Sequence, residues 1–343
     1  MKFTIFEDLK SEIVHHYDSD TKNIIKSTGN NFSIKLNGQE TSFSISGQNR
    51  FLMRFRLIRR LLRYDKSNAV LNWKRDGVIV LYQGKIYFFD LKEKKLNLID
   101  NLKQCRNVLH GGIAVKSSGI FFGEYGHNPD RNPVPIWKSE DDGRSFRVIK
   151  ELHEHQIKHI HGIYVDKFSD SLWVVTGDFN GECFLIESLD EKFSNLNWYG
   201  DGTQKWRPVS LFFTPDKVIW AMDSPIQRVY LQSFDRTTKS ITQGQYFPGP
   251  VWYSKQFESG DAVLQTTVEI GGEINSKDAI VFHSNDLIHW EEITRFKKDI
   301  LSMSYFKFGV ISFAEGKQSH KDFVLFGEGL INFDGISIRA AID

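Results

Sequence analysis

Residues 136–146 read IWKSEDDGRSF, an apolar run that ends in Ser139-Glu140-Asp141 and continues through a glycine. The same Ser-x-Asp ending follows an apolar run three more times along the chain. The four pairs are Ser139/Asp141, Ser188/Asp190, Ser233/Asp235 and Ser284/Asp286. Their serines lie 49, 45 and 51 residues apart. A fixed period of this length is typical of chains built from one repeated structural unit, such as the blade of a β-propeller.

A second pattern runs through the same repeats, in which a strand that follows a turn ends on a carboxylate or its amide. These end residues are Gln83, Glu124, Asp178, Asp223, Glu269 and Glu315. Another short strand precedes each of them. These preceding runs are NAVLNW, NVLHGGIAV, HIHGIYV, RPVSLFF, GPVWYS and ILSMSYF. Together with the Ser-x-Asp strand and one further strand, each repeat then holds four antiparallel strands, the composition of one propeller blade.

The repeats predict an all-β fold, a six- or seven-bladed β-propeller with four antiparallel strands per blade and a single domain over residues 1–343. Six repeats occupy residues 66–343, and residues 1–65 form an extra blade or a cap. We favour seven blades. The aromatic content of 14%, with 28 Phe, suits pleated and half-buried strands. A β-sandwich would also give many short strands, but the fixed period argues against it.

The segment from Ser139 to Phe146 resembles the Asp-box, or BNR repeat, of sialidase-like propellers, Ser-x-Asp-x-Gly-x-Thr-Trp. Ser145 and Phe146 replace the last two residues of that motif. Short Ser and Asp side chains hydrogen-bond turn backbone, and glycine permits positive φ, so we interpret the box as a structural hairpin. The resemblance implies propeller architecture and a glycan substrate. It assigns no catalytic residue, and the Arg-Ile-Pro element of those sialidases is absent near the N-terminus.

The residues with chemistry are expected at one face of the propeller. The first strand of a blade starts at the face where its antiparallel neighbour ends, so the two sets of strand ends converge there. The loop Gly123–Pro133 lies at the same face and adds a phenol and an imidazole. Candidate catalytic residues are Glu124, Tyr125, His110, His161, Asp178 and Asp223. Candidate substrate-binding residues are Arg106, His127, Arg131, Arg207, Arg228 and Glu269.

The run His159-Ile160-His161 suggests a metal. Alternate residues of a strand face the same side, so the two imidazoles could bind one divalent ion, with His110 from the neighbouring repeat as a third ligand. In the alternative interpretation, His161 hydrogen-bonds across the channel and His159 lies at the solvent edge. A divalent metal is therefore a possible cofactor and no cofactor is certain.

Three functions stay open. The first is a sialidase-like glycoside hydrolase that acts on an acidic or complex bacterial glycan, with the carboxylates as acid and base and the arginines as anion ligands. Tyr125 beside Glu124 is similar to the tyrosine and carboxylate that sialidases pair. The second is a polysaccharide lyase in which a histidine or tyrosine removes the proton next to a uronate carboxyl. The third is a non-catalytic propeller that binds carbohydrate or protein.

The bulk composition excludes some partners. A net charge of +1 gives no field for nucleic acid, and the acidic ring opposes it further. Cys105 and Cys183 make no disulfide framework. The N-terminus lacks the pattern of a signal peptide, and no window reaches the apolar length of a transmembrane segment. We therefore expect a cytoplasmic protein whose partner is a glycan; its oligomeric state is open.

Residues 51–64, FLMRFRLIRRLLRY, carry five arginines among large apolar residues. On a helical wheel most arginines collect on one side, and Phe51, Phe55, Ile58 and Leu62 share the other. An alternating strand fits as well. We expect this segment to pack on the body of the protein, in preference to lying at a membrane surface.

Overall fold

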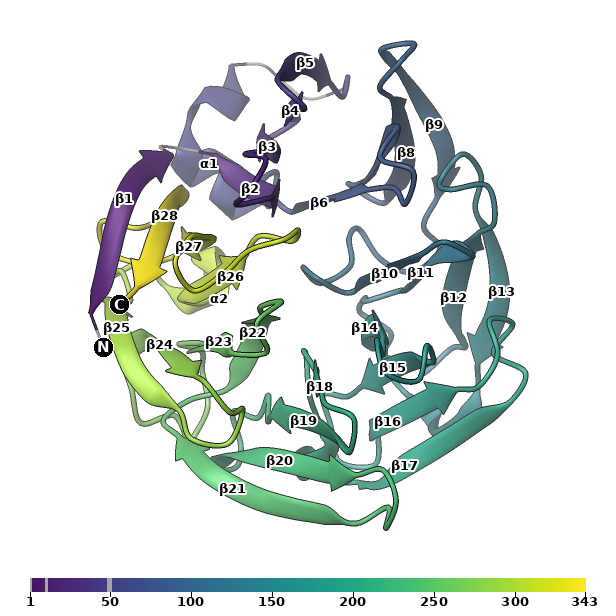
Figure 1. Cartoon of the computed structure of the whole chain (residues 1–343), viewed down its shortest axis with the longest axis vertical. Helices are drawn as coiled ribbons and strands as arrows, with labels where there is room; N and C mark the ends of the chain where they lie inside the picture. The colour runs from purple at the N-terminus through teal and green to yellow at the C-terminus, as the bar shows by residue number, and fades with distance from the viewer. Residues whose placement is uncertain (1, 10–11, 48–50) are drawn as a thin grey trace. The chain divides into compact units, whose positions relative to one another are not determined.

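The computed structural model describes residues 2–9, 12–47 and 51–343, and its fold is an all-β, seven-bladed propeller with four antiparallel strands in each blade. Figure 1 shows the strands of each blade side by side, mostly in chain order. The chain divides into two compact units, one of Met1–Ala69, Pro225–Arg228 and Gln245–Asp343, the other of Val70–Ser224 and Val229–Gly244. Among the described residues, no helix is long and apolar enough to cross a membrane.

The unit of Val70–Ser224 and Val229–Gly244 contains most of four sheets and two short 3-10 helices. The sheets are β6 (Ser67–Leu71), β7 (Gly77–Tyr82), β8 (Lys85–Asp90), β9 (Lys95–Asn101); β10 (Ile113–Lys116), β11 (Gly119–Gly123), β12 (Val134–Ser139), β13 (Arg147–Leu152); β14 (Ile160–Val165), β15 (Leu172–Thr176), β16 (Cys183–Ser188), β17 (Leu196–Gly202); and β18 (Phe212–Phe213), β19 (Lys217–Ala221), β20 (Val229–Asp235), β21 (Ile241–Phe247). The helices are η2 (Glu154–Gln156) and η3 (Gln204–Trp206).

The other unit holds three sheets. They are β2 (Ile13–Tyr17), β3 (Ile24–Thr28), β4 (Asn31–Leu36), β5 (Gln39–Ser44); β22 (Val251–Gln256), β23 (Ala262–Thr266), β24 (Asp278–Ser284), β25 (Glu291–Lys297); and β26 (Val310–Phe313), β27 (Phe323–Glu328), β28 (Ile336–Ile342), β1 (Phe3–Leu9). Its helices are η1 (Leu52–Arg54), α1 (Arg56–Leu62) and α2 (Met303–Phe306). The N-terminal strand β1 completes the C-terminal sheet, with Phe3 opposite Ile342, so the two termini lie together (Figure 1).

Burial explains the continuous apolar runs in the repeats. The second strands β7, β11 and β15 are buried along their whole length, because each has strands on both sides and packed side chains on both faces. Such strands appear as continuous apolar runs. Apolar side chains of β11 and β12 join those of β14, β15 and β16 in one core cluster. Each large apolar side chain buried there contributes about 1.5–3 kcal/mol.

The structure confirms the seventh blade and corrects the last repeat. Residues 13–44 form the four-stranded sheet β2–β5. ILSMSYF, predicted as a strand, contains the short helix α2, and GVISFAE is the first strand of its blade, not the second. Glu315 therefore follows a first strand and lies at the opposite end of its sheet from the other predicted end residues. The true second strand, β27, ends on Glu328 and keeps the predicted pattern.

The Ser-x-Asp segment at β12 forms the expected structural hairpin. Ser139 Oγ donates to Asp141 Oδ1 at 2.9 Å, and the Gly143 amide donates to Ser139 Oγ at 2.7 Å. Asp141 Oδ1 also accepts the Ser145 amide at 2.8 Å. Gly143 has a φ of +98°, and a Cβ there would lie 2.7 Å from Ile79. These side chains are occupied by turn backbone, as the motif's composition predicts.

The arginine-rich segment packs on the body of its unit through its charged side. Arg59 and Arg60 are each only 4% exposed, whereas Phe51 and Leu57 are more than half exposed. Arg59 donates to Asp65 at 2.9 Å and to the Met53 carbonyl at 2.7 Å. The helical wheel identified the two sides correctly, but the buried side is the charged one, because carboxylates lie beneath it.

Replacing Arg59 with alanine is expected to lower the free energy of unfolding by about 2–3 kcal/mol, because it leaves a partly buried carboxylate with one cation fewer. Arg56 still donates to Asp65 at 2.6 Å, so the expected loss is smaller than for a buried carboxylate that loses its only cation. Urea denaturation measures the change. The matched control is Arg54→Ala, on the exposed side of the same segment, with an expected change within about 0.5 kcal/mol. Equal losses for both variants would contradict the prediction.

Candidate functional site

The candidate site is formed where β14 begins and β15 ends. Antiparallel pairing sets Ile160 opposite Thr176, so the start of β14 lies beside the residues that follow β15. The register shifts between Ile160 and Gly162, a bulge that contains His161. Bulges re-aim side chains and are frequent beside active sites. Here His159, His161 and Asp178 converge, with their ligand-type atoms within 4.8 Å of one another.

Asp178 is held in an unusual backbone conformation. Its φ is 131°, a region that L-residues rarely adopt and that costs about 1–3 kcal/mol. Two side chains fix its carbonyl oxygen, with Arg207 Nη1 donating at 2.9 Å and Gln204 Nε2 at 3.1 Å. Lys158 Nζ lies 2.6 Å from Oδ2. Strain supported in this way is common at functional sites, where it fixes the direction of a side chain.

The two imidazoles are oriented by backbone carbonyls. His159 Nδ1 lies 2.9 Å from the Gly126 oxygen and His161 Nδ1 lies 2.7 Å from the Pro208 oxygen. A carbonyl oxygen only accepts, so both Nδ1 atoms carry hydrogen, and Nε2 is the atom of each ring that faces Asp178. Each Nε2 lies 3.4 Å from Asp178 Oδ1. Among the described residues, His159 Nε2 makes no hydrogen bond.

The protonation states strengthen this picture. Burial lowers the pKa of His159 to about 4, despite the opposing effect of Asp178, so the ring is neutral at pH 7. Burial alone would raise the pKa of the Asp178 carboxyl, but hydrogen bonding and charge from His159 and His161 outweigh it and hold the pKa well below its usual range. The Asp178 carboxylate is thus stabilised by positive charge on the side of the two rings, which a bound cation would supply when His159 is neutral.

The donor set fits a borderline divalent metal such as zinc. Tetrahedral zinc with bonds of 2.0–2.1 Å places neighbouring ligand atoms about 3.3 Å apart, close to the 3.4 Å from each Nε2 to Asp178 Oδ1. Metal-binding histidines usually donate their other ring N–H to a carbonyl or carboxylate, as both do here. Asp178 thus takes the position predicted for His110, a half-buried residue outside this group of ligand atoms.

Arg207 links the cluster to Asp223. Its Nη2 lies 3.1 Å from Asp178 Oδ1, and its Nε donates to Asp223 Oδ2 at 3.1 Å. Gln204, completely buried, accepts from Arg207 Nη1 at 3.2 Å. These contacts engage the guanidinium on several sides, so Arg207 is placed to position Asp178. Sequence reasoning missed Lys158 and Gln204; only the position of Lys158 beside His159 signalled a role.

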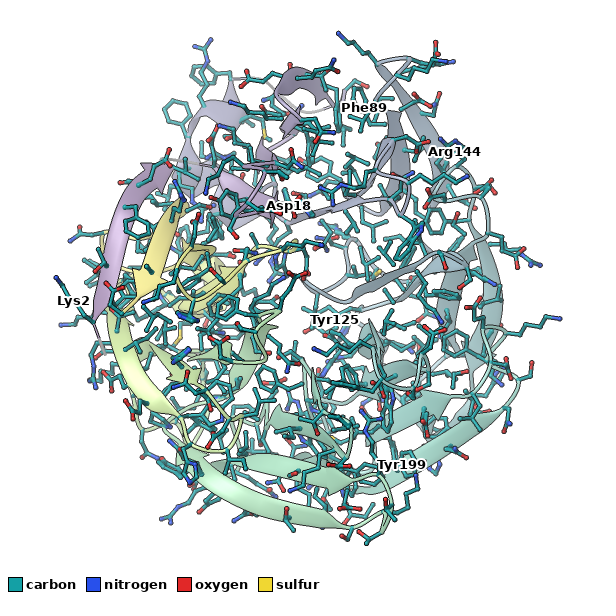
Figure 2. All side chains as sticks on the ribbon, in the orientation of Figure 1. Lys2, Asp18, Phe89, Tyr125, Arg144 and Tyr199 are labelled. Atoms are coloured by element: carbon teal, nitrogen blue, oxygen red, sulfur yellow. The ribbon has the colours of Figure 1, made fainter. Side chains whose placement is uncertain are left out.

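Tyr125 lies next to the imidazoles. Its ring centroid is 4.2 Å from that of His159 and 5.8 Å from that of His161, and Figure 2 shows it on the side of its sheet nearest β14. The side chain is partly exposed, unlike both histidines. Tyr125 therefore places a phenol beside both imidazoles at a position that solvent can reach.

Glu124, predicted as an acid or base, is buried and hydrogen-bonded within the protein. Its side chain is 1% exposed and accepts hydrogen bonds only from protein donors. Oε1 accepts from the Lys103 amide at 2.8 Å and from Trp137 Nε1 at 2.9 Å. Oε2 accepts from the Gln104 amide at 2.5 Å and from the Cys105 amide at 3.1 Å. Both oxygens of the Glu124 carboxylate are therefore held by protein donors.

The remaining predicted residues lie outside the cluster. Arg106 and His127 are exposed. Arg131 is paired with Glu182 at 2.6 Å and lies over the exposed ring of Phe179, as does Lys158. Arg228 and Glu269 belong to the other compact unit. The structure thus brings together Tyr125, His161, Asp178, Asp223 and Arg207 from the predicted set, with His159.

Comparison with known proteins supports the fold alone. No protein-family model matches the chain, so an Asp-box family is not shown, and no curated protein matches. Among solved structures, oligogalacturonate lyase from Vibrio parahaemolyticus aligns over 99% of this chain and 96% of its own, with a TM-score of 0.58 and 11% identity. A chain of a mitotic checkpoint complex aligns over 98% and 93%, with a TM-score of 0.59 and 8% identity.

A third similar structure is a domain described as the extracellular part of a hybrid two-component system, BT4673, from B. thetaiotaomicron. It matches with a TM-score of 0.57 and 12% identity over 98% of this chain. The chain spans only about two fifths of that protein's length, at 39%. An enzyme, the extracellular domain of a two-component system and a chain of a checkpoint complex share this architecture, so the fold alone does not define a function.

Proposed function

We propose that the chain is a carbohydrate-active enzyme of the lyase type, which cleaves an acidic polysaccharide next to a uronate residue at the cluster of Tyr125, Lys158, His159, His161 and Asp178. The observation that carries the proposal is the convergence of two imidazole Nε2 atoms on one ionised carboxylate oxygen, each at 3.4 Å. This arrangement suits a divalent cation, and Lys158 adds a positive charge beside it. A uronate carboxylate is the complementary ligand.

Hydrolysis, the first function suggested by the sequence, is supported less well. Most glycosidases need one carboxyl group that stays protonated to donate to the leaving oxygen. The pKa of Asp178 is held well below its usual range. Asp223 is buried against the Arg207 guanidinium, and Glu124 is surrounded by four donors. None of the three carboxylates is arranged as a general acid.

Elimination requires a base and cationic groups, and the cluster offers candidates for both. A base removes the proton on the carbon next to the uronate carboxyl, the electron pair forms a carbon–carbon double bond, and the glycosidic oxygen leaves with its electrons and takes up a proton. The charge that develops on the carboxylate needs cationic stabilisation. Lys158 supplies one cation, and a metal held by His159, His161 and Asp178 would act there as a Lewis acid. Tyr125, the partly exposed phenol, is the proposed base.

The proposal is tested with the full chain, metal salts and a panel of oligouronates, including oligogalacturonate because of the structural likeness. Each cleavage creates an unsaturated uronate, which absorbs in the near ultraviolet. Formation of this product would support the lyase. Tight binding of the oligosaccharides without any product would instead indicate a non-catalytic glycan-binding propeller, and a saturated reducing end as the only product would indicate a hydrolase.

Replacing Tyr125 with phenylalanine is expected to lower kcat about 100-fold and to change KM little, because it removes a proton-transfer group and keeps the ring that packs on His159. Steady-state kinetics on the best oligouronate measures both constants. The control is Tyr305→Phe, at a tyrosine 69% exposed in the other compact unit. A Tyr125→Phe enzyme with unchanged kcat would remove Tyr125 from the mechanism.

A further inference from the structure

A second group of ligand-type side chains lies in the other compact unit, far along the chain from the site described above. Asp261 immediately precedes β23, His283 lies in β24, and His320 lies in the loop between β26 and β27. His283 Nε2 is 3.0 Å from Asp261 Oδ2, and His320 Nδ1 is 2.9 Å from the same oxygen. Three separate chain segments thus bring two imidazole nitrogens onto one carboxylate oxygen.

The surrounding structure holds these three residues in place. The Ser259 hydroxyl donates to Asp261 Oδ1, which leaves Oδ2 for the imidazoles. The turn is fixed by the Phe257 amide, which donates to the Asp261 carbonyl at 2.9 Å. His283 pairs with Val263 in the sheet, and the His320 carbonyl accepts the Ile342 amide at 2.7 Å. Ligands that are supported in this way need little rearrangement to take up an ion.

Burial and ligand type define what this group would bind. Asp261 and His283 are 5% and 2% exposed, whereas the His320 side chain is 32% exposed and gives a route from solvent. Two imidazole nitrogens with one carboxylate oxygen form a set that suits zinc, cobalt or nickel, while magnesium and calcium prefer oxygen ligands. Both rings hydrogen-bond to Asp261 Oδ2, and a metal would displace these shared hydrogens on binding, because ligands hold a metal in their deprotonated form.

We propose that Asp261, His283 and His320 form a second site for a zinc-type divalent metal, with water at the open side, and that the bound metal stabilises the fold. The metal would join the loop that carries His320 to the sheet β22–β25. Asp261 and His320 are 59 residues apart in sequence. Since a ligand that binds only the folded chain stabilises it, zinc would raise the melting temperature without taking part in cleavage. The inference is independent of the reaction proposed above.

The test measures zinc content and thermal unfolding of the full chain after metal removal and reloading with zinc alone. We expect the wild type to retain two zinc ions if the first cluster also binds one, and His320→Ala and His283→Ala each to retain one fewer. Zinc should raise the melting temperature of the wild type by about 5 °C at 100-fold excess over Kd. The share of that shift that comes from this site should disappear in His320→Ala, a partly exposed loop position whose substitution leaves the core intact.

His289→Ala is the matched control. His289 follows His283 in the same hairpin and bonds to a carboxylate, Asp286, at 2.7 Å, but its side chain is 84% exposed. We expect it to keep full zinc content and the full thermal shift. Equal zinc content in His320→Ala, His283→Ala and His289→Ala would overturn the proposal. If only the first cluster failed to bind zinc, the wild type would contain one zinc ion. His283→Ala would lose that ion, and His161→Ala would keep it.

Discussion

Replacing Asp178 with asparagine is expected to reduce turnover of a uronate substrate about 1,000-fold and to release the metal from the His159 and His161 cluster. The change removes the negative charge on which both Nε2 atoms converge at 3.4 Å. Asparagine is the informative substitution, because it keeps the size of the side chain and tolerates positive φ better than most residues. The backbone of residue 178, with its φ of 131°, then stays close to its native conformation.

Zinc content and kcat, measured on the same sample, check this prediction. Asp223→Asn is the control for zinc content, because Asp223 shares Arg207 with Asp178 and is even more deeply buried, but does not belong to the ligand group. It is expected to keep the zinc bound by the cluster. If Asp178→Asn kept its zinc and its turnover, neither the metal site nor the reaction proposed for it could stand.

The fold was predictable because its signals are local and repeated. Ser139 and Asp141 bond to the backbone of their own turn, so the hairpin leaves the same mark in the sequence wherever it recurs. Second strands are covered on both faces and appear as apolar runs that end on a polar residue, as β15 does before Asp178. The last blade was misread where α2 interrupts the pattern and the short β26 resembles a second strand.

The site was predictable only in part. The spacing of His159 and His161 predicted that their imidazoles lie close together, which is a local property, and their ring centroids are 5.1 Å apart. The third ligand depends on how the chain turns after β15, and that turn is fixed by Gln204 and Arg207, more than 20 residues further on. In the same way, the wheel of residues 51–64 separated charged from apolar sides, but which side is buried depends on Asp299 and Asp334, far away in the chain. Such long-range partners leave no periodic signal.

Replacing Glu124 with alanine is expected to lower the free energy of unfolding by about 4 kcal/mol, the largest stability loss among the changes considered. Four donors would lose their acceptor, the amides of residues 103–105 and the Trp137 indole. Each buried donor left without a partner costs about 1–3 kcal/mol, with some recovery as water enters. The loss in unfolding free energy should be intermediate for Glu124→Gln, because its amide oxygen still accepts hydrogen bonds while its –NH2 group faces other donors. Denaturant unfolding measures the series.

The same two variants separate a structural from a catalytic role for Glu124, which the sequence alone placed among the catalytic residues. If the carboxylate only supports the amides of residues 103–105 and the Trp137 indole, the folded fraction should account for the activity of Glu124→Gln. Its kcat per folded molecule should then stay within about threefold of the wild type, a barrier change of about 0.7 kcal/mol. A general acid or base would instead lose about 100-fold or more with the fold intact. That second result would contradict the hydrogen-bonding argument and return Glu124 to the reaction.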